Sequence, residues 1–442
     1  MGLQPKAGEV RHAVRSVARP IQDFLRLESS SGILLFLFTA VALVWANSPW
    51  AGSYGELWHT EISLGVGSIG VSRSLLHWIN DGLMALFFFV VGLEIKREML
   101  IGELASLRKA LLPVVAALGG MLVPALIFMA LNWGTDSIAG WGIPMATDIA
   151  FSLGVLALLG RRIPIQLKVF LTAFAIVDDI GAVIVIAFFY ASGIIWSHLL
   201  VAAILFLLLI VANWAGVRHP LVYAILGLLL WIAFLDSGIH ATVSGVLIAM
   251  TIPARSTLDR RGFLEKAYAI LRQLERGDRK EGLETTEPSP QPSVRALAEL
   301  AENVEAPTQR FEHALHPWVT FFIMPLFALS NAGVTFEQGV GTLAMNSAAL
   351  GVFLGLVLGK QLGITLFSWA AVKIRLASLP NGVTWRHIYG VGWLGGIGFT
   401  MSLFIASLAF GPGPAVDASK IGIYAASVVS GLGGLIILGR KY

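Results

Sequence analysis

The sequence predicts an all-α membrane protein with about twelve transmembrane helices and one small external β-hairpin. Of its 442 residues, 56% are hydrophobic and only 13% are charged, which is more apolar sequence than a soluble core of this size needs. The apolar residues form segments close to the length of about 20 residues with which a helix spans a bilayer. The basic residues lie mainly in alternate loops between these segments, as expected for a chain that crosses the membrane repeatedly.

The apolar segments organise the chain into two membrane regions. The twelve segments cover residues 31–48, 74–98, 109–131, 137–159, 165–191, 197–214, 220–235, 238–252, 313–334, 347–371, 387–411 and 418–438. If the N-terminus is cytoplasmic, all but three of the 31 Lys and Arg residues lie in the tails and loops on the cytoplasmic side of the membrane. We therefore expect a cytoplasmic tail (1–30), helices 1–8 (31–252), a cytoplasmic loop (253–312), helices 9–12 (313–438) and a cytoplasmic C-terminus (439–442).

The composition also excludes several classes of function. The chain has no cysteine, so disulfides, thiolate chemistry and Cys-ligated metals are excluded. Its net charge of +4 comes from basic loops beside membrane spans, so we expect a lipid bilayer and no nucleic acid as its partner. We see no Walker-type glycine loop, and we expect neither an enzyme nor a bound cofactor.

Two loops have a structure of their own. Residues 61–72 alternate apolar and polar positions around Gly67-Ser68, which predicts an external β-hairpin. Its free edge could pair with a second copy; the alternative is an ordinary flexible loop. Residues 258–276 combine a helical apolar spacing with basic residues, which suggests an amphipathic helix at the membrane surface. The polar, Pro-rich segment 278–293 after it is expected to be disordered.

The fifth segment carries two adjacent carboxylates, Asp178 and Asp179, near its middle. An ionised Asp at the centre of a membrane helix costs about 2.5 to 3.5 kcal/mol, so both must face protein, water or a cation. Consecutive helical positions point about 100° apart, and the two carboxylates therefore address different partners. We favour a proton or cation site over a purely structural pair.

Two further segments are interrupted. Thr147 and Asp148 follow Gly142 and Pro144 in the fourth segment, and a run of glycines precedes Thr400 in the eleventh. Each interrupted segment is the second of a triplet, and the two triplets start on opposite sides of the membrane. This pattern is typical of two inverted-topology repeats whose broken helices cross near the midplane and form the binding site.

Other polar residues complete the candidate site. Lys360 lies deep in the tenth segment, and we expect it to pair with Asp178 or Asp179 because an unpaired ammonium there is very costly; alternatively, its stem reaches the cytoplasmic face. A cytoplasmic cluster of acidic and His residues could respond to pH, since His titrates near neutrality, or could be an interfacial salt-bridge cluster. Its members are Glu94, Glu98, Glu312, His313 and His316, around Arg97.

Several of these stretches together resemble the NhaA family of bacterial sodium/proton antiporters. They read ATDIAFSLGVLALLG, FAIVDDIGA, HWINDGLMALFFFVVGLEIKRE, FEHALHPWV and GGIGFTMSLFIASLAF. The resemblance runs from about residue 31 to 438. Inverted repeats with broken helices are a known feature of this family, and the loop 253–312 is longer than we expect in it.

The resemblance implies residue roles and a location. Asp179 is then the principal Na⁺/Li⁺ and proton ligand, Asp178 its neighbour paired with Lys360, and Thr147 and Asp148 balance the half-helix dipoles. Glu94, Glu98, Glu312, His313 and His316 match the family's pH-response cluster, His240 matches a histidine linked to pH response, and the 61–72 hairpin matches the contact of a homodimer. The implied location is the bacterial inner membrane, and the implied physiology is pH homeostasis and salt tolerance.

The expected mechanism is alternating access, in which Na⁺ or Li⁺ competes with protons for the same carboxylate oxygens. If two protons exchange for one cation, the exchange is electrogenic. One alternative is a proton-coupled carrier of another solute. Another is an intramembrane aspartyl protease, which needs two Asp on separate helices sharing a proton; adjacent Asp178 and Asp179 fit that poorly.

Overall fold

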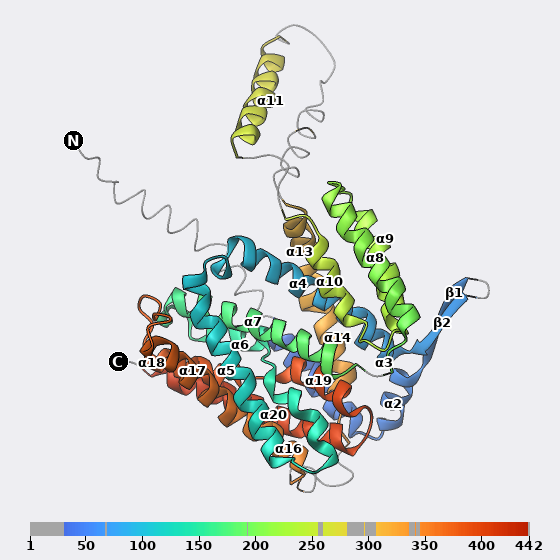
Figure 1. Ribbon diagram of the computed structural model, residues 1–442, viewed down its shortest axis with the longest axis vertical. Helices are drawn as coiled ribbons and strands as arrows, with labels where there is room; N and C mark the ends of the chain where they lie inside the picture. The colour runs from blue at the N-terminus through green and yellow to red at the C-terminus, as the bar shows by residue number, and fades with distance from the viewer. Residues whose placement is uncertain are drawn as a thin grey trace.

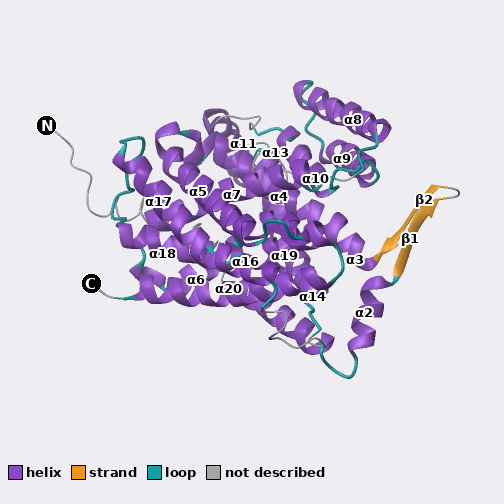
Figure 2. Ribbon diagram, turned by 60° about the horizontal axis from the view of Figure 1, so that its bottom comes forward, coloured by secondary structure: helices purple, strands orange, loops and turns teal. Residues whose placement is uncertain are grey.

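The computed structural model describes residues 31–66, 69–191, 193–254, 260–280, 296, 306–335, 341 and 345–440. The chain is a bundle of helices from which a hairpin projects (Figures 1 and 2), and the helix of residues 260–280 stands apart from the bundle in Figure 1. The first part contains the helix Ser31–Ala46, α2 (Ala51–His59), β1 (Glu61–Val66), β2 (Ile69–Ser74), α3 (Leu75–His77), α4 (Met84–Ile101), α5 (Leu107–Leu131), α6 (Ile149–Leu158) and α7 (Ile165–Phe189). The middle part contains α8 (Trp196–Trp214), α9 (Pro220–Leu235), α10 (Thr242–Thr251) and α11 (Arg260–Lys280). The last part contains α13 (Pro307–Trp318), α14 (Met324–Asn331), α16 (Ser347–Leu354), α17 (Lys360–Lys373), α18 (Trp385–Gly395), α19 (Phe399–Phe410) and α20 (Pro414–Gly439).

The helices have the length and composition of a multi-pass membrane protein. Within the described residues, seven helices are long and apolar enough to cross a membrane, or up to ten if each of three bent pairs is one span. The shorter apolar helices α9 and α10 would complete the twelve that the sequence predicts, a count that stays a prediction. Helix α8 exposes most of its length, with Trp196 75% and Trp214 91% exposed near its two ends. Exposed Trp at both ends suits the two membrane interfaces.

The predicted hairpin is present. β1 and β2 pair antiparallel from Glu61 opposite Ser74 to Val66 opposite Ile69, because period-two alternation on both sides of a two-residue link favours this pairing. The link itself, residues 67–68, lies outside the described residues. The hairpin projects from the helical bundle in both ribbon views (Figures 1 and 2).

Glycines allow α5 and α17 to pack closely. A Cβ added at Gly119 would lie 2.3 Å from the carbonyl oxygen of Gly363, and one added at Gly359 would lie 2.7 Å from Cα of Pro124. Small residues at such spacing let helix backbones approach in a membrane, where apolar burial does not drive association. This contact fixes α17 at the position from which Lys360 enters the core. A π-helical turn, Gly355–Gly359, directly precedes Lys360, and such turns are frequent at functional sites.

Two spans are broken, as the sequence predicts. A 3₁₀ segment, Asp136–Met145, and α6 are separated by residues 146–148 and bend by 45°. Helices α18 and α19 are separated by residues 396–398 and also bend by 45°. Pro144 lacks a backbone donor, and the adjoining extended residues end the first half-helix.

The structure differs from two predicted boundaries. Helix α13 begins at Pro307, so Glu312 lies inside a helix and not at the end of a loop. Helix α10 begins at Thr242, so His240 precedes it, although we expected His240 within a span. The predicted amphipathic helix is α11, which extends to Lys280 and so includes the first three residues of the segment 278–293 that we expected to be disordered. Residues 281–293 of that segment lie outside the described residues.

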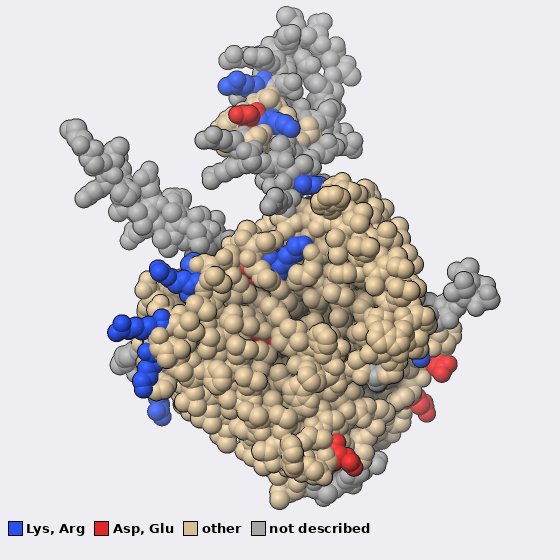
Figure 3. All heavy atoms as spheres, in the orientation of Figure 1, with Lys and Arg blue, Asp and Glu red and all other residues tan. Residues whose placement is uncertain are grey.

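Charged side chains are distributed unevenly over the surface. In the face shown in Figure 3, Lys and Arg gather toward the upper and left edges, whereas Asp and Glu appear toward the lower right and, beside Lys and Arg, on the part that projects at the top. This separation fits the charge bias that the sequence predicts between the two sides of the membrane. The orientation of the termini stays a prediction.

Candidate ion-binding site

The two broken spans meet at their breaks. The backbone N–H of Asp148 donates to the carbonyl oxygen of Ile397 at 2.7 Å, and the Thr147 hydroxyl donates to that of Gly395 at 2.9 Å. One turn further along α6, the Ser152 hydroxyl donates to the carbonyl of Leu394 at 2.8 Å. The carbonyls at the end of a helix have no partner within it. Residues of the first broken span therefore satisfy the free carbonyls of the second.

Asp148 joins the N-terminal ends of two half-helices. One of its carboxylate oxygens accepts from the backbone N–H of Phe151 at 3.0 Å and so caps α6. The other accepts from the backbone N–H of Thr400 at 3.1 Å and from the Thr400 hydroxyl, at the start of α19. Helix N-termini carry partial positive charge, so one buried carboxylate stabilises both. The sequence does not predict the contact of Thr400 with Asp148. It indicates only that Thr400 follows a run of glycines.

Lys360 is paired with Asp178. Its ammonium nitrogen lies 2.9 Å from both carboxylate oxygens of Asp178, and the two side chains are 0% and 1% exposed. Phe174 lies on α7 together with Asp178, and its ring centroid is 5.6 Å from the same nitrogen. The sequence left Asp178 and Asp179 open as partners, and the geometry selects Asp178. Both predicted partners of the pair are fully buried, as an intramembrane ion pair must be.

Asp179 points about 100° away from Asp178 around α7 and lines a cavity. The cavity measures about 80 Å³, and Asp148, Asp179, Thr147 and Thr400 are among its lining residues. Asp178 is not among them. Within the part of the chain that the structure describes, Asp179 makes no hydrogen bond or ion pair, and no group of three or more His, Cys, Asp or Glu could hold a metal. The two adjacent carboxylates therefore have different surroundings, as their angular separation predicts.

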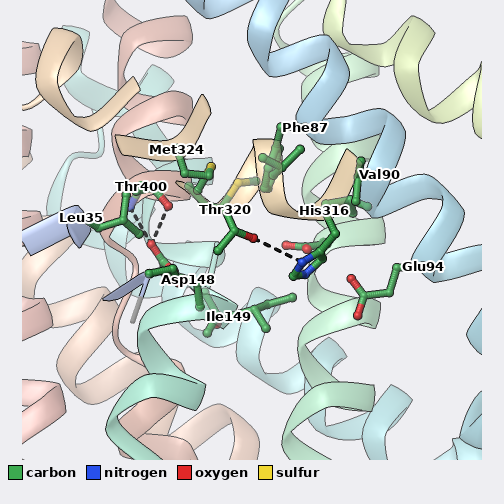
Figure 4. Close-up of a pocket in the computed structure, with 17 residues that line it drawn as sticks. Leu35, Phe87, Val90, Glu94, Asp148, Ile149, His316, Thr320, Met324 and Thr400 are labelled. Atoms are coloured by element: carbon green, nitrogen blue, oxygen red, sulfur yellow. Dashed lines mark hydrogen bonds between the residues drawn. The ribbon is translucent and has the colours of Figure 1, made fainter. Parts of the chain in front are cut away.

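The cavity extends from the crossing of the broken spans to the charged cluster. Glu94 of α4 and His316 of α13 line it together with Asp148 (Figure 4). The His316 ring nitrogen Nδ1 lies 3.4 Å from the Thr320 hydroxyl oxygen. Phe87 and Val90 are among the apolar residues that line the cavity. One hollow thus connects Asp179 with two of the residues that we expected to respond to pH.

Arg97 holds the charged cluster together. Its guanidinium lies 3.8 Å from a carboxylate oxygen of Glu94 and 3.5 Å from one of Glu98, and it bonds directly to the buried Glu312. His313, next to Glu312 on α13, is exposed. The cluster therefore links α4 to α13, the two helices that flank one side of the cavity.

His240 lies in a different group. Its Nε2 is 3.4 Å from a carboxylate oxygen of Asp81, whose other oxygen is 2.6 Å from Nε2 of His77. The His240 ring also contacts the Thr242 hydroxyl at 3.0 Å. The structure does not bring His240 together with the cluster around Arg97. Asp81 is the centre of this second group.

The chain is similar to known sodium/proton antiporters over nearly its whole length. Residues 22–438 match the family described as Na⁺/H⁺ antiporter 1. The Na⁺/H⁺ antiporter NhaA of Oleidesulfovibrio alaskensis is 50% identical over 434 residues, which cover 98% of this chain and 96% of that protein. The Na⁺/H⁺ antiporter NhaA of Koribacter versatilis is 52% identical over 422 residues, or 96% of this chain and 91% of that protein. By this match and these identities, the chain belongs to the NhaA family of Na⁺/H⁺ antiporters.

Proposed function

We propose that this protein exchanges Na⁺ or Li⁺ for H⁺ across the bacterial inner membrane, with Asp179 as the principal binding carboxylate. The single observation that supports Asp179 most strongly is its position: it is buried, lines the cavity and has no hydrogen-bonding partner among the described residues. Small hard cations prefer oxygen ligands, and the neighbouring oxygens are those of Asp148, Thr147 and Thr400. A proton and a cation compete for the same carboxylate, so binding of one releases the other.

Asp178 and Lys360 form the second part of the proposed site. The ammonium neutralises Asp178 while Asp179 is free to take a proton or a cation. When the cation binds, Asp178 can leave Lys360 and become a second cation ligand, and Lys360 then releases a proton. Two protons for one cation would make the exchange electrogenic, worth about 2.3 kcal/mol per charge per 100 mV of membrane potential.

The crossing of the broken spans is the proposed centre of alternating access. Asp148 and Thr147 keep the two breaks joined and balance the charges of the half-helix ends. We propose that the two triplets of spans are inverted repeats that place this crossing near the midplane, within twelve helices with both termini in the cytoplasm. Movement of one group of helices against the crossing would then open the cavity to one side at a time.

The cluster around Arg97 is the proposed pH-response element. Glu94, Glu98, Glu312, His313 and His316 are charged or titratable groups at one end of the cavity. A change in their protonation alters the links that Arg97 makes between α4 and α13. We place His240, with Asp81 and His77, in a second responsive group.

The decisive experiment measures dissipation of a pH gradient on adding Na⁺, Li⁺ or K⁺ to everted membrane vesicles. We expect a response to Na⁺ and Li⁺ that Asp179→Asn abolishes, while the exposed Asp136→Asn leaves it unchanged as the matched control. An unchanged response in Asp179→Asn would move the site elsewhere. A solute-dependent proton flux without Na⁺ or Li⁺ would favour the alternative carrier.

The same vesicles test the two finer proposals. Electrogenic exchange accelerates when a membrane potential is imposed, and voltage-independent exchange would refute it. Glu312→Gln should change the pH at which exchange is half-maximal because it removes the buried carboxylate bound to Arg97. A pH profile identical to that of the wild type would remove Glu312 from the response.

A further inference from the structure

Helix α11 has an apolar face that the transport site does not use. At 100° per residue, Phe263, Leu264, Ala267, Ile270 and Leu271 fall within one arc of the helix. Leu264 and Leu271 are each 43% exposed, and Phe263, Ala267 and Ile270 are half-buried. Tyr268, at the edge of the same arc, is 61% exposed. A helix of a globular protein normally buries such a face against a core, so this one requires a partner.

The charges of α11 identify the kind of partner. The sequence of Arg260–Lys280 contains seven Lys or Arg residues and three Asp or Glu residues. Lys266 borders the apolar arc, about 40° beyond Ile270, whereas Arg272 and Glu265 lie together on the opposite, polar side. An apolar face bordered by basic residues is typical of helices that lie in the interface of an anionic membrane. Long basic side chains keep their charges at the headgroups while their stems cover apolar surface.

The chain holds α11 close to one membrane face. Helix α10 ends at Thr251, and both the N–H and the hydroxyl of Thr308 donate to the carbonyl of Pro253, at 3.3 and 3.0 Å. The segment that contains α11 therefore leaves and re-enters the bundle at one point. Arg260 follows Pro253 by seven residues, which extend by at most about 25 Å, so the start of α11 stays within that distance of Pro253. Lys96, which donates to the carbonyls of Met250 and Ile252, marks this same end of the bundle.

We propose that α11 lies on the anionic lipid surface at this membrane face, with Leu264 and Leu271 among the acyl chains and Lys266 at the headgroups. The tether places both ends of the segment beside α13, which carries Glu312. Binding of α11 to anionic lipid would therefore act on the helix end next to the charged cluster. The occupant is the lipid surface, and neither the bundle itself nor a second copy.

The full-length protein allows a direct test because it has no cysteine. Leu271→Cys reports on the apolar face, and Ala269→Cys, on the opposite face of the same helix turn, is the matched control. Each variant is labelled with an environment-sensitive fluorophore and reconstituted in nanodiscs of phosphatidylcholine, alone or with an equal part of phosphatidylglycerol. A fraction of the lipids carries a quencher in the acyl chain.

We expect lipid quenching at position 271 in the anionic nanodiscs only, with position 269 unaffected. Lys266→Gln should lower the ratio of docked to undocked helix about fivefold, because one basic residue near an anionic surface contributes about 1 kcal/mol. Equal quenching at 271 and 269, or quenching independent of lipid charge, would overturn the proposal. A blue-shifted probe at 271 without lipid quenching would place the face against protein, either the bundle or a second copy, and would overturn it as well.

Discussion

The ion pair between Lys360 and Asp178 gives the sharpest test of the site's physical construction. Both side chains are at most 1% exposed, and both carboxylate oxygens are 2.9 Å from the ammonium. Taking two charges out of water is costly, and their attraction repays that cost only in such geometry. Removing one partner leaves the other charge buried without compensation. Each single substitution should therefore lower the free energy of unfolding far more than the double substitution does.

The expected magnitudes follow from this burial. Lys360→Met keeps an unbranched chain, and Asp178→Asn keeps the shape of the carboxylate. Each single change should lower the free energy of unfolding by about 3 to 5 kcal/mol. The double variant has no buried charge and leaves one amide, so it should lose only about 1 to 3 kcal/mol. The summed losses of the two single variants should thus exceed the loss of the double variant by about 3 kcal/mol or more.

The measurement is reversible unfolding in mixed micelles of detergent and dodecyl sulfate, applied to the wild type, both single variants and the double variant. Lys109→Met is the matched control, because Lys109 pairs with Glu103 while its own side chain is 61% exposed; it should cost about 1 kcal/mol or less. If the two single losses add in the double variant, the pair contributes no coupling and the reasoning fails. A loss at Lys360 no larger than that at Lys109 would contradict it too.

Two further predictions concern the crossing and the hairpin. Thr400→Val removes the hydroxyl that donates to Asp148 and should lower the free energy of unfolding by about 1.5 to 3 kcal/mol, whereas Thr400→Ser keeps it; equal losses in the same titration would refute this. We propose that the β1–β2 hairpin forms a homodimer contact. Glu61 and Ser74 face each other, so two glycines can join them in place of the residues between. This deletion should convert a dimer to a monomer in light scattering. A dimer that survives this deletion places the contact elsewhere.

Local patterns predicted the elements that local interactions determine. The hairpin follows from alternation over residues 61–72, and α11 follows from the apolar spacing within 258–276. The breaks in two spans follow from Pro144 and from the glycines before Thr400. The pairing of Lys360 follows from the cost of a buried ammonium, since few carboxylates lie at a similar depth. Each of these needs only neighbouring residues or one strong energetic constraint.

Contacts between distant segments could not be predicted from such patterns. A serine such as Ser152 looks like any small helical residue, and only the approach of α18 makes it a donor to Leu394. Gly119 and Gly363 are two among 47 glycines, and nothing in the sequence distinguishes the pair that lets α5 touch α17. The family resemblance links His240 to pH response, but nothing in the sequence indicates that its neighbour is Asp81.

The arrangement of the cavity limits how exchange can occur. One wall comes from α4 and α13, with Glu94 and His316, and the other comes from α6, α7 and α19, with Asp148 and Asp179. The second wall is held internally, because Asp148 bonds α6 to α19. The first wall is held by the bonds of Arg97 between α4 and α13. Since each wall is tied within itself and the cavity lies between them, we expect the site to close by movement of one wall against the other, with the charged cluster travelling as part of the first.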